Sequence, residues 1–161
     1  MTGARVVDGA VILREARGDD ETFLRDLYES TRDDLAAVDW PSEQLDAILA
    51  LQWAAQKEGY RALHPAASDQ IVELDGEAVG RILVDTTGST TTIVDVALLP
   101  GARGRGLGTR LLEGVLAGAR QHRSRVVLHV ERSNRARHLY ERLGFTVDGE
   151  RGLHVAMAWT P

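Results

Sequence analysis

Residues 92–109 read TIVDVALLPGARGRGLGT, and the fold can be predicted from this stretch. Apolar residues occupy both faces of its first half, which is typical of a central strand rather than an edge strand. Pro100 and Gly101 end that strand, and an apolar stripe at helical spacing begins near Thr109. The glycine-rich segment 103–108 therefore lies between the end of a central strand and the start of a helix.

The glycine-rich segment has the features of an anion site. Gly104, Gly106 and Gly108 alternate, so successive backbone N–H groups can turn to one side without obstruction by side chains. The following helix adds the partial positive charge of its first turn, and Arg103 and Arg105 add full charges. We predict a pyrophosphate site here; a glycine-rich turn with solvated arginines is the structural alternative. The Walker A and Rossmann patterns, which bind phosphates in other folds, do not match.

Outward from this segment, apolar periodicity and turn residues predict the remaining elements. The predicted strands are residues 11–16, 70–74, 77–84, 92–99, 126–131, 145–147 and 154–159. The predicted helices cover residues 23–31, a segment that starts at Ser42 and ends at Gly59, residues 109–121 and residues 135–143. Asp75-Gly76 suits a two-residue hairpin turn, Asn134 a helix N-cap, and Gly144 a left-handed helix end. The order β-α-α-β-β-β-α-β-α-β-β predicts an α/β fold with most strands in one mixed sheet.

Composition restricts the classes of function. With 161 residues, 43% hydrophobic and 27% charged, the chain is predicted to form a single domain over residues 1–161. It contains no cysteine, which excludes disulfides and thiolate nucleophiles and fits a reducing compartment. A net charge of −5 disfavours nucleic acid as the main partner, and no segment predicts a signal peptide or a membrane span, so we expect a cytoplasmic protein. No histidine or carboxylate spacing predicts a metal site.

Two linked motifs resemble those of the GNAT superfamily of N-acetyltransferases. The segment from Leu98 to Pro100, followed by residues 103–108, resembles the acetyl-CoA signature of that superfamily. Downstream, residues 134–145 look like its N-x-A-x-x-L-Y-x-x-x-G-F block. The resemblance covers residues 92–145. It implies a mixed, mostly antiparallel sheet of about seven strands flanked by four helices.

The resemblance implies acetyl-CoA as the acyl donor, with no metal. The residues it assigns to the cofactor are Leu98, Leu99, Arg103, Gly104, Arg105, Gly106, Leu107, Gly108, Thr109 and Asn134. It also implies a primary amine as the acceptor, which attacks the thioester directly. Tyr140 matches the tyrosine of the second block and is the expected hydrogen-bond donor to the thiolate sulfur; packing against the sheet is its alternative role.

Three residues compete for the role of the base. His129 lies in the strand that separates from its neighbour in the family, and its ordinary pKa suits proton uptake near neutral pH. Asp95 lies in the neighbouring strand among apolar residues, where it could orient His129, hold the ammonium or act as the base itself. Glu131 is the third possibility. A structural role remains the alternative for each.

The acceptor itself is not identified by the sequence. Tyr28, Gln52, Gln56 and Tyr60 belong to the helical half that covers the acceptor pocket in the family, so we expect them to bind the substrate. Two other classes of function stay open: a non-catalytic acyl-CoA-binding or regulatory module, and an RNA-binding domain that uses a patch of arginines. The oligomeric state is expected to be monomer or homodimer.

Overall fold

The computed structural model describes residues 5–8 and 11–161. Its strands are β1 (Arg5–Asp8), β2 (Val11–Glu15), β3 (Ser68–Leu74), β4 (Glu77–Thr87), β5 (Thr90–Leu98), β6 (Arg125–Glu131), β7 (Thr146–Arg151) and β8 (His154–Trp159). Its α-helices are α1 (Glu21–Ser30), α2 (Asp33–Ala36), α3 (Ser42–Leu63), α4 (Leu107–His122) and α5 (Ala136–Arg142). Short 3-10 turns, Gly18–Asp20 and Pro100–Ala102, precede α1 and the glycine-rich loop. Among these helices, none is long and apolar enough to cross a bilayer.

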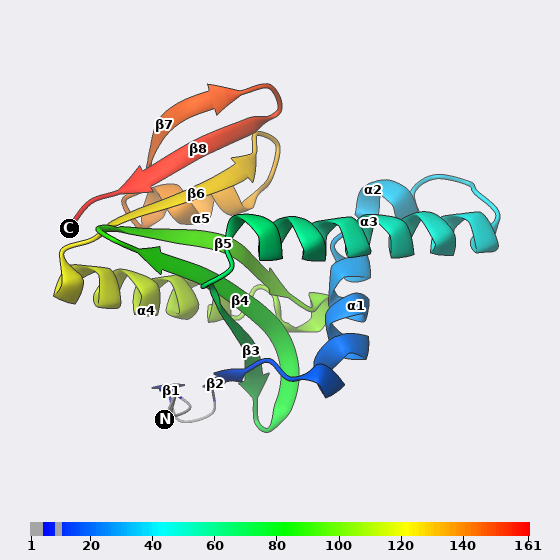
Figure 1. The fold of residues 1–161 in the computed structure, drawn as a ribbon, viewed down its shortest axis with the longest axis horizontal. Coiled ribbons are helices and arrows are strands. Elements are labelled where there is room, and N and C mark those ends of the chain that lie inside the picture. The colour runs from blue at the N-terminus through cyan, green and yellow to red at the C-terminus, as the bar shows by residue number, and fades with distance from the viewer. Residues whose placement is uncertain (1–4, 9–10) are drawn as a thin grey trace.

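The strands form one sheet in the order β1-β2-β3-β4-β5-β6-β8-β7 (Figure 1). All neighbours are antiparallel except β5 and β6, which are parallel and are connected through α4. The predicted α/β fold with a mixed, mostly antiparallel sheet is therefore confirmed. Because β5 and β6 run in the same direction near the middle of the sheet, their ends with the same polarity lie side by side.

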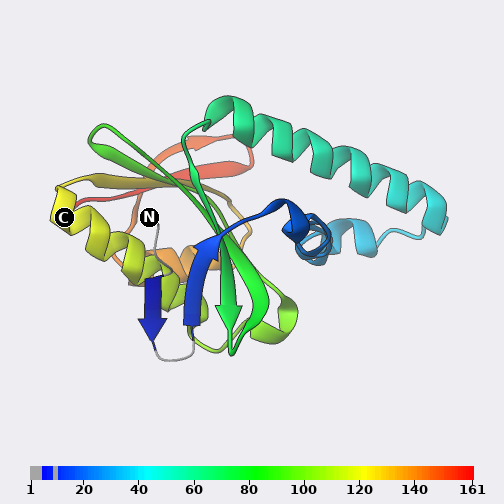
Figure 2. The same cartoon turned by 60° about the horizontal axis from the view of Figure 1, so that its bottom comes forward.

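Helices cover both faces of the sheet (Figure 2). On one face, Leu112 and Leu116 of α4 pack against β6 and β8, and Leu107 and Leu111 pack against β2, β3 and β4. Burying a leucine side chain of this kind contributes about 1.5–3 kcal/mol. α3 lies on the opposite side of the sheet from α4, and α1 contacts α3, β4 and β5.

Turn residues behave as their chemistry predicts. Asp75 and Gly76 have φ values of 51° and 85°, so the β3–β4 hairpin has the predicted two-residue turn with both central residues left-handed. Gly144 has a φ of 99° just after α5, as expected for a left-handed helix end. The Asn134 side chain accepts a hydrogen bond of 2.9 Å from the Ala136 N–H, but the N-cap of α5 is Arg135, one residue later than predicted.

The structure corrects the sequence-based element list in three places. β1 forms an additional strand within the first ten residues, and α2 is an additional single turn, so the described residues have eight strands and five α-helices rather than seven and four. α3 does not end at Gly59 but continues to Leu63. A glycine inside a helix costs only about 1 kcal/mol, whereas Pro65 disfavours the helical conformation of His64 before it.

Candidate active site

The site is built around a gap between β5 and β6. The two strands pair only from Thr90–Ile93 to Arg125–Leu128; β5 then continues to Leu98 and β6 to Glu131 without pairing to each other. Where they separate, β5 has a bulge, because Asp95 pairs with Leu83 while Ile93 pairs with Val84. One residue, Val94, is therefore extra in the register. The edge of β5 that faces β6 consequently carries backbone groups without a strand partner.

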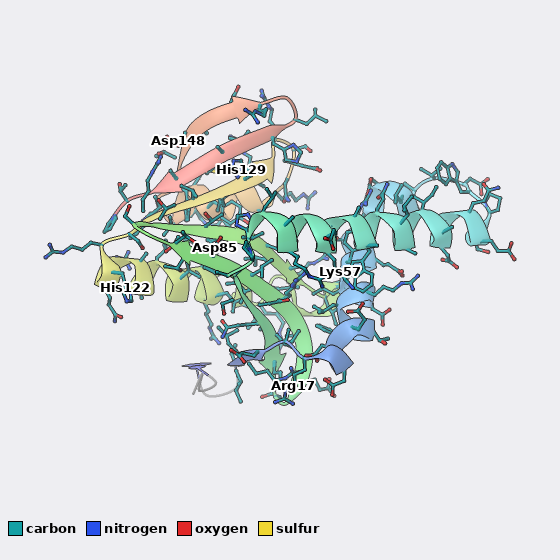
Figure 3. The ribbon with its side chains drawn as sticks, in the orientation of Figure 1. Arg17, Lys57, Asp85, His122, His129 and Asp148 are labelled. Atoms are coloured by element: carbon teal, nitrogen blue, oxygen red, sulfur yellow. The ribbon has the colours of Figure 1, made fainter. Side chains whose placement is uncertain are left out.

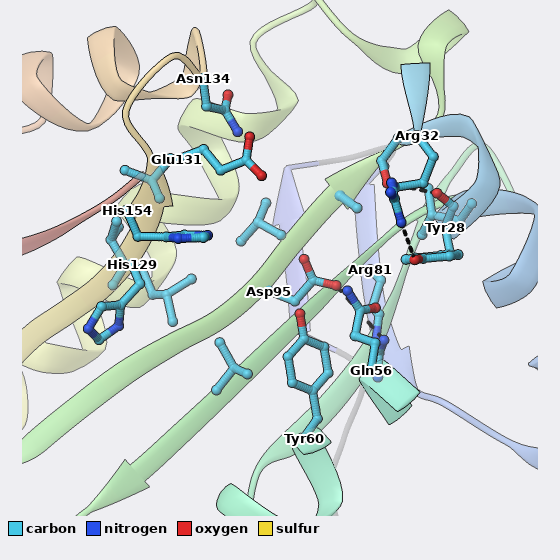
Figure 4. Close-up of a pocket in the computed structure, with 18 of the residues that line it drawn as sticks. Tyr28, Arg32, Gln56, Tyr60, Arg81, Asp95, His129, Glu131, Asn134 and His154 are labelled. Atoms are coloured by element: carbon cyan, nitrogen blue, oxygen red, sulfur yellow. Dashed lines mark hydrogen bonds and ion pairs between the residues drawn. The ribbon is translucent and has the colours of Figure 1, made fainter. Parts of the chain in front are cut away.

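A cavity of about 740 Å³ fills this gap. Its walls come from β5, β6, α1, α3 and α5 (Figure 4). Most of the residues predicted for catalysis or acceptor binding line it, namely Tyr28, Gln56, Tyr60, Asp95, His129, Glu131 and Tyr140, and so does Asn134. A second cavity of about 340 Å³ shares the side chains of Tyr60 and Arg81 with the first. Lys57, which projects from α3 (Figure 3), lines only this second cavity.

Asp95 is the carboxylate at the centre of the large cavity. Its side chain is 26% exposed, and its Oδ2 lies 3.9 Å from the Arg81 Nη1. Burial raises the pKa of Asp95 to about 6; the Arg81 charge lowers this pKa, and the neighbouring Asp69 charge raises it. The Tyr60 hydroxyl and the Arg81 guanidinium point toward the carboxylate (Figure 4). A group with this pKa can accept and release a proton near neutral pH.

Tyr140 comes to the same cavity from α5. Its ring packs edge-on against Phe145 with 5.8 Å between ring centroids, so both the packing role and a role in the cavity apply. Burial raises the pKa of the Tyr140 hydroxyl, and the Asp95 charge adds to the increase. The hydroxyl has no hydrogen-bond partner among the described residues, which leaves its proton available to a ligand.

The opposite wall belongs to β6 and carries His129 and Glu131, which are both exposed. Figure 4 shows the His129 ring turned away from Asp95, and within the described part of the chain no hydrogen bond or ion pair joins these two side chains. The reason is the gap itself, because β5 and β6 stop pairing at Ile93 and Leu128. The structure therefore places His129 and Asp95 on facing walls of one cavity rather than in one hydrogen-bonded unit.

The glycine-rich loop follows β5 and leads into α4. Gly104 and Gly106 have φ values of 71° and 78°, a conformation that L-residues with side chains rarely adopt, and Gly106 is the N-cap of α4. The N–H groups of residues 104–106 donate no hydrogen bond to the backbone of any described residue. The first-turn N–H groups of α4 also have no partner within the helix. Such donors, together with the helix dipole, are suited to binding an anion.

The predicted cofactor residues have different positions within this loop. The Arg103 Nε donates to the Leu98 carbonyl at 2.9 Å and an Arg103 Nη to the Ser30 carbonyl at 3.4 Å, so this side chain ties the loop to β5 and α1. Arg105 is exposed, and half-buried Thr109 lies in the first turn of α4. Leu107 is 3% exposed and anchors α4 in the core.

The remaining predicted cofactor residues, Leu98, Leu99 and Gly108, lie where the loop meets its neighbouring elements. Leu98 packs against the core beside Leu107, and the Leu99 N–H donates to the Val79 carbonyl at 2.8 Å. A Cβ at Gly108 would lie 3.4 Å from the Leu139 side chain, so α4 and α5 lie close together at this position. Leu98 and Leu99 thereby join the start of the loop to the core and to β4.

One predicted acceptor residue, Gln52, lies outside the cavity lining. Its side-chain oxygen accepts a hydrogen bond from Arg32, which lines the cavity. Arg32 also donates to the Tyr28 hydroxyl at 2.6 Å and forms a two-bond ion pair with Asp34 at 3.0 and 2.9 Å. Gln52 therefore acts on the cavity through Arg32.

Sequence reasoning missed Arg32 and Arg81. Arg32 lies among charged residues that resemble a solvated turn, so nothing in its neighbourhood distinguishes it. Arg81 offered a signal, because a single arginine before the apolar run of a central strand needs a buried partner. Among the described residues, no group of histidines and carboxylates could hold a metal ion.

Comparison with known proteins agrees with this geometry. Residues 23–145 match the model of the acetyltransferase (GNAT) family. The PaiA N-acetyltransferase of Thermoplasma acidophilum, solved in complex with coenzyme A, superposes with a TM-score of 0.73 at 14% identity, covering 94% of this chain and 99% of that one. The ribosomal-protein-S18-alanine N-acetyltransferase of Escherichia coli gives a TM-score of 0.66 at 17% identity over 93% of each chain.

A sequence relative is the 5-NmdU N-acetyltransferase of Pseudomonas phage PaMx11, which is 40% identical over 74 residues, or 43% of this chain. The aligned part spans about half, 51%, of that relative's length. The structural neighbours are too dissimilar in sequence to indicate more than the fold, but the family model covers most of this chain. The chain belongs to the acetyltransferase (GNAT) family.

Proposed function

We propose that the protein transfers an acetyl group from acetyl-CoA to a primary amine. The observation that carries this proposal is that β5 connects the two parts of the site. It runs from Asp95 in the gap to residues 103–108, which we call the anion loop. A CoA pyrophosphate fits the free N–H groups of the loop. The unpaired edge of β5 from residue 94 to 98 offers donors and acceptors to an extended amide chain such as the pantetheine arm. That path directs a thioester toward Tyr140 and Asp95.

The chemistry requires two proton transfers. The neutral amine nitrogen attacks the thioester carbonyl carbon, a C–N bond forms, and the C–S bond breaks. Asp95, directly or through a water, takes the proton that the amine loses, and the Tyr140 hydroxyl gives a proton to the leaving sulfur. Each such group contributes roughly 10²- to 10⁴-fold to the rate. His129 and Glu131 on the facing wall remain alternative bases.

The charges around the cavity suit a cationic acceptor. Its two arginines are engaged with carboxylates, Arg32 with Asp34 and Arg81 with Asp69. Asp95 and Glu131 add negative charge to the cavity, and Arg81, which is paired with Asp69, offsets the charge of Asp95 only from 3.9 Å. An amine enters such a site in its charged form and is attracted to Asp95 before it loses its proton.

Two acceptor classes follow from different observations. Because the neighbour from Escherichia coli is named for the alanine of a ribosomal protein, a peptide N-terminus is one candidate. The phage relative is named a 5-NmdU N-acetyltransferase, and the aromatic rings of Tyr28, Trp53 and Tyr60 line the cavity, where a planar base could stack. A small primary amine, free or on a peptide, remains the general proposal.

The test is an acetyl-CoA-dependent screen that measures the release of free CoA. Peptides with N-terminal alanine, 5-aminomethyl-deoxyuridine, aminoglycosides, polyamines and amino acids should be compared with the wild-type protein and Asp95→Asn. We expect CoA release above the hydrolysis background with at least one class, and its loss in the variant. Binding of acetyl-CoA without release for any amine would instead support the non-catalytic acyl-CoA-binding module.

A further inference from the structure

Arg81 lies between two carboxylates on one face of the sheet. Leu83 on β4 pairs with Asp69 on β3 and with Asp95 on β5, so the two carboxylates flank β4 at the same level. Arg81 precedes Leu83 by two residues and therefore projects from the same face of β4. Its guanidinium reaches both acids, as Figure 4 shows for Asp95. We call Asp69, Arg81 and Asp95 the acid–base row.

The two contacts of Arg81 within the acid–base row are unequal. The Arg81 Nε donates to the Asp69 Oδ1 and an Arg81 Nη to the Asp69 Oδ2, both at 2.8 Å, which is a two-bond pairing. The Nη1 lies 3.9 Å from the Asp95 Oδ2, which is beyond hydrogen-bond distance. Parallel double hydrogen bonds are the strongest arrangement for an arginine and a carboxylate. Asp69 therefore holds the guanidinium, and Asp95 receives only its long-range charge.

Packing fixes Arg81 in this position. Its side chain is only 11% exposed, and its Cζ lies 5.9 Å from the centre of the Tyr60 ring. The Asp69 side chain is 33% exposed and lines the second cavity but not the first. The Arg81 side chain thus lines both cavities, with Asp69 at the second cavity and Asp95 at the first.

No other group that faces Asp95 from the elements described below supplies a positive charge in place of Arg81. Tyr60 of α3 and Tyr140 of α5 carry hydroxyls that are neutral at physiological pH, since burial raises the pKa of each. Tyr28 of α1 forms no hydrogen bond with Asp95 in the described structure, and its hydroxyl accepts one from Arg32. His129 and Glu131 of β6 lie across the cavity without a bond to Asp95. Arg81 is the nearest cation to Asp95 within the described residues.

We infer that Asp69 is a positioning residue that binds Arg81 and so keeps its guanidinium beyond hydrogen-bond distance of Asp95, which leaves the Asp95 carboxylate free to take a proton from the acceptor amine. The inference rests on the proposed function for its catalytic meaning. The effect of Asp69 and Arg81 on the titration of Asp95 can be measured without turnover. Arg81 provides the positive charge near Asp95, and Asp69 binds that charge at a distance from Asp95. Removing Asp69 must therefore lower the proton affinity of Asp95, and removing Arg81 must raise it.

The two substitutions that test the row are Asp69→Asn and Arg81→Gln. Without the Asp69 charge, Arg81 is released toward Asp95 and stabilises its charged form, so the Asp95 titration moves to lower pH. Without Arg81, the charged form loses its cation, and the titration moves to higher pH by about one unit. We expect the acidic limb of the kcat/KM profile, measured with one amine throughout, to move in the same two directions.

The measurement uses the full chain with ¹³C-labelled aspartate carboxyls, followed by NMR from about pH 4 to pH 8, and Asp95→Asn assigns the signal. Asp85→Asn is the matched control, because Asp85 lies on β4, the strand of Arg81, binds His64 and Thr87, and lines neither cavity. This control should leave the Asp95 titration unchanged, and so should Asp69→Glu, which retains the negative charge at position 69.

The readouts separate this inference from the proposed function. If the Asp95 titration moves in opposite directions in Asp69→Asn and Arg81→Gln but no amine causes CoA release, the positioning role of Asp69 is supported and the acetyltransferase proposal is contradicted. Normal turnover with an Asp95 titration that Asp69→Asn leaves unmoved, or moves upward, would overturn the row and leave the proposed function intact. Because the Asp69 charge also acts on Asp95 directly, Asp69→Asn should lower the Asp95 titration more in the wild type than in the Arg81→Gln background, and equal shifts in the two backgrounds would overturn the positioning role. If Arg81→Gln does not fold, Arg81→Met serves as the background.

Discussion

The two halves of the molecule carry their parts of the site in different ways. From β5 to α5, the anion loop and the gap are made by the backbone, through glycines with positive φ, a bulge and the end of strand pairing. From α1 to α3, the cavity wall is made by side chains that hold one another, as Arg32 holds Tyr28 and Gln52. Backbone geometry leaves a pattern of glycines and turn residues in a sequence, whereas side-chain pairs between distant residues leave none.

The largest effect is expected in the backbone-built half, from Gly106→Asp. Gly106 has a φ of 78° at the N-cap of α4, so the substitution adds both strain and a negative charge beside the N–H groups. A ligand at a hundredfold excess over its Kd stabilises a protein by about 2.7 kcal/mol. Acetyl-CoA should therefore raise the melting temperature of the wild type, and Gly106→Asp should abolish the shift.

Two variants separate the causes of that loss. Gly106→Ala adds strain without charge and should retain part of the shift. Gly118→Asp adds the same charge to α4 far from the loop, where a new Cβ meets no atom within 4 Å, and should retain all of it. Equal shifts in the wild type and Gly106→Asp would remove the anion-site assignment.

The next largest effect compares the two walls of the gap. Asp95→Asn should lower kcat/KM by roughly 10²- to 10⁴-fold, because the amine loses its proton acceptor. His129→Gln should cost less, and since no bond joins His129 to Asp95 in the described structure, the two losses should add in the double variant. Steady-state kinetics over a pH series measures this.

The pH profile of kcat/KM shows which of the two residues, Asp95 or His129, is the base. Because the Asp95 carboxylate accepts the proton, activity should fall as the pH drops through its pKa of about 6. This limb should disappear in Asp95→Asn and persist in His129→Gln. A limb lost only in His129→Gln would make the histidine the base, and a double variant no worse than the poorer single variant would indicate one coupled unit.

The fold was largely predictable because its local signals agree. The hairpin at Asp75-Gly76, the helix end at Gly144 and the loop at Gly104 and Gly106 each need a backbone conformation that few residues adopt. The end of α3 was predicted wrongly because Gly59 is a weak signal in a helix that tertiary contacts hold.

Several residues that line the cavity were predictable from the sequence, but the contacts between their side chains were not. Asp95 stood out as a lone carboxylate in an apolar strand, and the structure places it in the cavity. Its relation to Arg81 and Asp69 depends on strand register, which brings together residues 69, 83 and 95. Register follows from the whole sheet and from the bulge at Val94, and a single sequence does not specify either.

A smaller effect is expected from Tyr140→Phe, which tests the helix that closes the backbone-built half. The packing of the ring on Phe145 remains, while the unpartnered hydroxyl disappears. We expect kcat to fall roughly tenfold or more, with the affinity for acetyl-CoA unchanged. Stopped-time CoA release and calorimetric titration measure the two quantities. An unchanged kcat would assign Tyr140 to packing alone.

The smallest effect is expected in the side-chain-built half, from Gln52→Ala. Gln52 does not line the cavity and acts only by accepting a hydrogen bond from Arg32, so its loss loosens one wall without touching the chemistry. One such bond is equivalent to about 0.5–1.4 kcal/mol, and KM for the amine should rise about two- to tenfold. The kcat value and the acetyl-CoA affinity should stay unchanged. Leu51→Ala, at a neighbouring α3 residue that is 72% exposed, is the matched control and should be silent. A fall in kcat for Gln52→Ala at unchanged KM would mean that Arg32 contributes to the transition state, and the helical half would then share the chemistry that we assign to the strands.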